Sequence, residues 1–79
     1  MAEKTTPEKL RILLPHWLEH NRSHQNEFRQ WLDKTRDEGL ITTAAFIEKA
    51  LKSMQETDKA LEEALEALGG PVEDKGHHH

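Results

Sequence analysis

Hydrophobic residues recur along this chain at the three- and four-residue spacing of amphipathic helices. The clearest repeat is an unbroken heptad ladder of Ile47, Ala50, Met54, Thr57, Leu61, Ala64 and Leu68. Leu51 and Leu65 widen this apolar stripe on one side. The sequence Gly69-Gly70-Pro71 follows and is typical of a helix end. The pattern therefore predicts a helix over about residues 43–68.

A second long stretch, from His16 to Glu38, contains neither glycine nor proline. Its large apolar residues gather on one side of a helical wheel, and they are Trp17, Leu18, Phe28, Trp31 and Leu32. We expect the three aromatic residues of this group to lie in the core. Gly39 is placed to cap the helix in the left-handed conformation, with Leu40 as the apolar residue that follows. The stretch predicts a helix over about residues 15–38.

The first helical segment is predicted over about residues 7–14, after a disordered leader over residues 1–6. Thr6 before Pro7 favours a helix start, and Thr5 with Glu8 is an alternative capping box. Pro15 follows the apolar residues 10–14, and an interior proline removes a hydrogen bond and clashes with the preceding turn. Either a short helix ends before Pro15 or one helix kinks there; we favour the short helix and a new start.

Two long helices of similar length, joined by a short turn, predict an all-α antiparallel helical hairpin. The hairpin with its short N-terminal helical segment forms one domain over residues 7–70. Each apolar stripe is wider than a single partner helix would cover. We therefore expect a homodimer that forms a four-helix bundle, and the alternative is a monomer that uses the N-terminal segment as a third helix.

Composition and charge narrow the class of protein. The chain has 79 residues, of which 34% are hydrophobic and 33% charged, and it has no cysteine. Disulfides, thiolate zinc sites and cysteine nucleophiles are therefore excluded. The net charge of −4, without a basic cluster, argues against nucleic-acid binding. Without a membrane-length apolar run or a signal peptide at the start, the expected location is the cytoplasm, with no membrane partner.

Three histidines form the most specific chemical feature of the sequence. His16, His20 and His24 recur every four residues, and Glu27 lies on the same side of the helix. Histidines four residues apart can chelate a divalent transition metal such as zinc, nickel or cobalt. The outer two are about 12 Å apart along the helix axis. One adjacent pair with Glu27, or with a group from elsewhere, is therefore the expected ligand set.

Asp58 is the candidate ligand from the second long helix. Antiparallel pairing of residue i with about 81 − i places His24 near Thr57 and His20 near Leu61, next to Asp58. A carboxylate within an apolar ridge needs a partner if it is buried. Asp58 could be a ligand, an acceptor for a histidine or a member of an ion pair. Alternatively, His24 is a core-edge residue packed on aromatic side chains, and the other two histidines are ordinary surface residues.

The tail over residues 71–79 is expected to be disordered. Its last three residues, His77–His79, are typical of a purification tag, and we leave them out of the functional interpretation. No acid–base or nucleophile arrangement, Glu-x-x-His motif, His-Glu-x-x-His motif or glycine-rich phosphate loop is visible. We therefore expect no enzymatic activity.

The stretch from Leu14 to Trp31, Leu-Pro-His-Trp-Leu-Glu-His-Asn-x-x-His-x-x-Glu-Phe-x-x-Trp, is followed by a helix rich in Glu, Ala and Leu that ends in Ala-Leu-Gly-Gly. From about Leu10 to Gly70 the chain resembles a family of small uncharacterised prokaryotic helical-hairpin domains. The resemblance implies a hairpin fold and motif positions at His16, Trp17, His20, Asn21, His24, Glu27 and Phe28. It implies no reaction.

These observations lead to two functional hypotheses. In the first, the domain binds a divalent transition metal through His16, His20 and His24 with Glu27 or Asp58, and serves in metal sensing, buffering or delivery. In the second, it is a non-catalytic dimeric protein–protein interaction module in which the histidines are structural.

Overall fold

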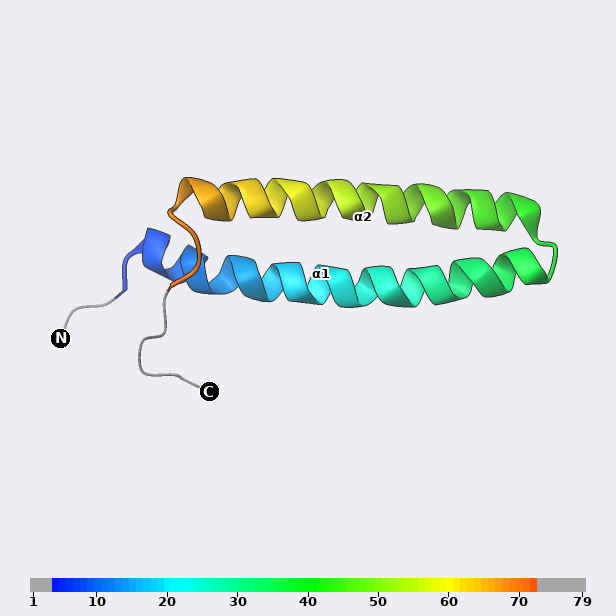
Figure 1. Ribbon diagram of the computed structural model, residues 1–79, viewed down its shortest axis with the longest axis horizontal. Coiled ribbons are helices and arrows are strands. Elements are labelled where there is room, and N and C mark those ends of the chain that lie inside the picture. The colour runs from blue at the N-terminus through cyan, green and yellow to red at the C-terminus, as the bar shows by residue number, and fades with distance from the viewer. Residues whose placement is uncertain (1–3, 73–79) are drawn as a thin grey trace.

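Two antiparallel helices lie side by side and form a hairpin (Figure 1). The computed structural model describes residues 4–72, in which α1 spans Thr6–Asp37 and α2 spans Ile41–Ala67. No strand occurs in residues 4–72, and neither of their helices has an apolar stretch long enough to cross a membrane. Because the two helices are antiparallel, the start of α1 lies beside the end of α2 (Figure 1). The predicted all-α helical hairpin is confirmed.

One continuous helix occupies the region where the sequence predicted two. Pro15 lies inside α1, so the predicted helix boundary before Pro15 is wrong. An interior proline costs roughly 3 kcal/mol. Leu14 and Leu18, on either side of Pro15, are both buried. Their burial in the hairpin core keeps both sides of the proline in one helix.

The ends of α1 are held by local hydrogen bonds. At the start, the alternative capping box is the one observed: the Thr5 amide donates to Glu8 Oε1 over 2.8 Å, and Thr5 Oγ1 accepts from the Glu8 amide. At the other end, Gly39 has a φ of +77°, and the Leu40 amide donates to the Thr35 carbonyl over 3.0 Å. This is the left-handed glycine cap that the sequence predicts.

The core between the helices is thin. Its buried apolar residues are Leu14, Leu18, Leu32, Ala44 and Leu51. Along α2, most of the predicted ladder is at least partly buried, but two of its members, Thr57 and Ala64, are exposed. The residues that follow them, Asp58 and Leu65, are partly buried instead. The inner ladder of α2 thus includes a carboxylate.

The aromatic residues of α1 do not all enter this core. Phe28 packs against the cluster of Leu32, Ala44 and Leu51, as predicted. Trp17 and Trp31 are 43% and 56% exposed, so the prediction that they are core residues is wrong. Each tryptophan precedes a buried leucine, and consecutive helical residues point about 100° apart. The direction of α1 that faces α2 is that of the leucines, which leaves both tryptophans beside the interface.

Candidate functional site

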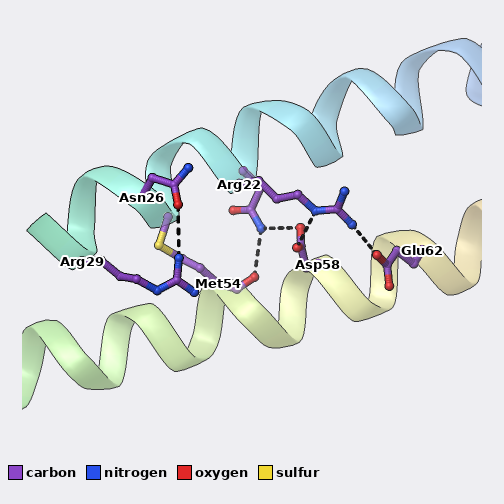
Figure 2. Close-up of polar contacts among 7 residues, drawn as sticks. Arg22, Asn26, Arg29, Met54, Asp58 and Glu62 are labelled. Carbon is purple, nitrogen blue, oxygen red and sulfur yellow. Dashed lines mark hydrogen bonds and ion pairs between the residues drawn. The ribbon is translucent and has the colours of Figure 1, made fainter.

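A polar cluster crosses the middle of the hairpin, and Figure 2 shows its residues. The Asn21 amide nitrogen donates to Asp58 Oδ1 over 3.1 Å and to the Met54 carbonyl over 2.9 Å. Arg22 Nε donates to Asp58 Oδ2 over 3.0 Å, and the same guanidinium also pairs with Glu62. Both oxygens of Asp58 are therefore engaged by α1.

The environment of Asp58 favours its charged form. Partial burial, which leaves 17% of its side chain exposed, acts to raise the pKa of the carboxyl. Hydrogen bonds from Asn21 and Arg22 outweigh that effect and bring the pKa of Asp58 below its ordinary value of 3.8. The same contact raises the pKa of Arg22. Asp58 is thus an ionised group of the helix interface.

Gln25 lies one turn beyond Asn21 and is buried. Its Nε2 has no hydrogen-bond partner among the residues that the structure describes. A buried polar group without a partner costs roughly 1–3 kcal/mol of desolvation. Gln25 is therefore a weak point of the interface.

Replacing Gln25 with methionine is expected to stabilise the hairpin. The unpaired amide is removed while a similar volume is kept, and a gain of about 1 kcal/mol would raise the melting temperature by about 4–8 °C. Thermal unfolding followed by circular dichroism measures the change. Gln30→Met, at an exposed position of the same helix, is the control and should leave the melting temperature nearly unchanged. A fall in the Gln25→Met variant would contradict this prediction.

The histidine pair lies on a different side of α1. Nε2 of His20 and Nε2 of His24 are 3.0 Å apart, and the two rings meet edge to face with centroids 4.5 Å apart. On the far side of the His24 ring, Nδ1 lies 3.6 Å from Glu27 Oε1. The three side chains are exposed. Three of the five predicted ligands are therefore neighbours, but Glu27 lies at the ring nitrogen of His24 that faces away from His20.

The other two predicted ligands lie elsewhere. His16 is exposed and has no hydrogen bond or ion pair within residues 4–72, and the hydrogen bonds of Asp58 go to Asn21 and Arg22. In the same residues, no group of three His, Cys, Asp or Glu side chains is arranged to hold a metal ion. Within residues 4–72, a single chain thus offers one pair of histidines with a carboxylate nearby.

Sequence reasoning missed the partners of Asp58. The available signal was the position of Asn21 and Gln25 on the ridge of buried Leu14, Leu18 and Leu32, where polar residues need partners across the interface. Arg22 gave no such signal, because half of its side chain is exposed and its role depends on the register of α2.

The two flanks of the hairpin differ in chemistry. Ion pairs between the helices, Arg22 with Glu62 and Arg36 with Glu48, mark one flank. On the opposite flank, helical periodicity places large apolar side chains and histidines of α1 beside mostly small side chains of α2. We call this flank the histidine–aromatic face; its residues are Leu13, Trp17, His20, His24 and Trp31 from α1, and Phe46, Ala50, Ser53, Thr57, Ala60, Ala64 and Ala67 from α2.

Comparison with known proteins identifies a family but no function. No curated protein and no solved structure matches the chain. One family model matches residues 10–68, which include both helices apart from the first turn of α1, and its description is "Domain of unknown function (DUF8180)". This span covers the histidine pair, the polar cluster and the histidine–aromatic face, and the chain therefore belongs to the DUF8180 family.

Proposed function

We propose that this domain binds a divalent transition metal through His20 and His24 and serves in metal sensing, buffering or delivery in the cytoplasm, without catalysis. The observation that carries the proposal is the 3.0 Å separation of the two Nε2 atoms. Two nitrogens bound to one tetrahedral zinc ion, at the usual bond length, are about 3.3 Å apart. Rotation of the two rings, so that both Nε2 lone pairs point toward one common position, would give a chelating geometry.

Glu27 supports the same reading. Its carboxylate lies 3.6 Å from Nδ1 of His24, the ring nitrogen that does not face His20. Metal-bound histidines usually donate their second ring N–H to a carboxylate or carbonyl, which fixes the tautomer and leaves the other nitrogen free for the metal. Glu27 would therefore orient His24, whereas Asp58 is already engaged by Asn21 and Arg22.

Calorimetric titration with zinc, nickel and cobalt tests the proposal. The background chain should carry alanine at His77, His78 and His79, which lie outside the described residues and would compete for the metal as a run of histidines. We expect His20→Ala and His24→Ala each to weaken binding at least tenfold, because each removes one of two chelating ligands. His16→Ala is the matched control and should leave the affinity unchanged. Equal affinity in the background chain and in His20→Ala would contradict the proposal.

A second candidate function is a dimeric protein–protein interaction module in which the histidines are structural. The exposure of Trp17 and Trp31 favours it, because large aromatic side chains in a patch are typical of interaction surfaces. In this case His20→Ala lowers the melting temperature through loss of the contact with His24, whereas added metal leaves the melting temperature of the background chain unchanged. Thermal unfolding with and without zinc distinguishes the two functions.

A further inference from the structure

We infer that a second copy of this chain packs on the histidine–aromatic face, with its α1 antiparallel to the first α1, and that the two His20–His24 pairs meet as one four-histidine metal site. The inference rests on the proposed metal binding and names the partner that completes the site. It also identifies the second copy as the surface that covers the exposed tryptophans.

The histidine pair is half of a metal site. Zinc in structural sites is bound by four ligands, and one described chain brings only two histidine nitrogens together. The sequence of α2 contains no histidine, and Asp58 is held by Asn21 and Arg22. Both histidines are exposed on the outer side of α1. The missing ligands are therefore expected from another molecule.

The α1 part of the face is self-complementary. A two-fold symmetric interface requires that residue i contacts residue j of the second copy and that j contacts i. A two-fold axis at the level of Arg22 places Leu13 opposite Trp31 of the second copy, His20 opposite His24 of the second copy, and Trp17 opposite Glu27 of the second copy. Each histidine then lies only two residues, about 3 Å along the helix, from the axis. Two pairs of Nε2 atoms would share one centre.

The α2 part of the face is consistent with the same axis. Its small residues pair about the level between Asp58 and Lys59, as Ala50 with Ala67, Ser53 with Ala64 and Thr57 with Ala60. The hydrogen bond from Arg22 to Asp58 places this level beside Arg22 in the hairpin. Helix axes approach to about 8 Å where contact residues are small. One two-fold axis can therefore pack α1 on α1 and α2 on α2, which completes a four-helix bundle.

Charge also differs between the two flanks, because the charged residues beside this face, Glu27 and Lys34, contact His24 and Trp31 rather than α2. The ion-paired residues Arg22, Arg36, Glu48 and Glu62 lie on the other side of the hairpin, where they remain in solvent. Trp17 and Trp31 would be buried in the bundle, which supplies the apolar burial that the thin core of a single hairpin lacks. Metal binding and dimer formation would then stabilise each other, because the dimer supplies four histidines to the metal and the metal links the two chains.

Zinc stoichiometry and molar mass, measured on one sample, test the inference. In the background chain with alanine at residues 77–79, we expect one zinc per two chains by calorimetry, and the mass of a dimer by light scattering. Trp31→Glu should weaken zinc binding more than tenfold and give a monomer, although both histidines are intact. Gln55→Glu introduces the same charge on the ion-paired flank and should change neither quantity. Circular dichroism checks that each variant keeps its helices.

The possible results separate the two proposals. One zinc per chain at the mass of a monomer overturns the shared site and leaves the proposed function standing. No zinc binding overturns both. A dimer that binds one zinc per chain also overturns the four-histidine site. His24→Ala is a second variant that leaves the core intact, and a zinc-dependent dimer that survives in it would contradict the inference as well.

Discussion

Replacing Leu51 with alanine is expected to lower the free energy of unfolding by about 2–5 kcal/mol. Leu51 is 6% exposed and forms the buried cluster with Leu32 and Ala44, against which Phe28 and Ile47 pack. Truncation removes apolar burial and leaves a cavity that two long helices, fixed by their backbone hydrogen bonds, cannot close completely. In a chain of 79 residues such a loss is a large part of the total stability.

Urea unfolding at one fixed protein concentration measures this effect, since association would make the stability depend on concentration. Leu40→Ala is the matched control: the same substitution in the turn between the helices, at a side chain that is 51% exposed. It should cost far less, because little apolar surface leaves the core. Equal losses in the two variants would show that the cluster around Leu51 is not the centre of the core.

The two long helices and their antiparallel pairing could be predicted from the sequence because their signals are local. Apolar residues repeat at helical spacing, and Gly39 followed by Leu40 ends α1 as a left-handed cap. The expected pairing of residue i with about 81 − i also agrees with the hydrogen bonds from Arg22 to Asp58 and from Arg11 Nε to the Gly70 carbonyl. These features depend on chain order and helix geometry alone.

The continuity of α1 through Pro15 could not be predicted, because tertiary packing decides it. The proline weakens the helix locally, and only the burial of Leu14 and Leu18 against α2 shows that the helix continues. The exposure of Trp17 and Trp31 depends likewise on which direction of α1 faces α2. An apolar stripe wider than one partner leaves that choice open in the sequence.

The candidate site was predicted only in part, for a related reason. The approach of His20 to His24 follows from their four-residue spacing, which any regular helix turns into a contact. The expected approach of Asp58 to the histidines required the rotation of α1 as well as its register. The interface lies on the side of Asn21, about 100° from His20, so Asp58 meets the amide and Arg22.

Asp58→Asn is expected to destabilise the hairpin by about 1–3 kcal/mol at pH 7, and to do so less as the pH falls. The substitution keeps the size of the side chain but removes the charge that accepts hydrogen bonds from Asn21 and Arg22. In the folded protein the pKa of Asp58 is below its ordinary value of 3.8. Its stabilising contribution is therefore complete above the unfolded pKa and is lost as the pH falls through the lower folded pKa.

The comparison needs urea unfolding of the wild-type chain and of Asp58→Asn at pH 7 and at about pH 2.5, below the unfolded aspartate pKa of about 3.9. The difference between the two chains should shrink at the lower pH, because protonation of Asp58 in the wild type removes the same charge. Asp33→Asn removes a carboxylate from an exposed position of α1 and should cost less than about 0.5 kcal/mol at pH 7. A difference for Asp58→Asn that is as large at pH 2.5 as at pH 7 would show that its charge contributes nothing to the hairpin, and that packing alone explains its place between the helices.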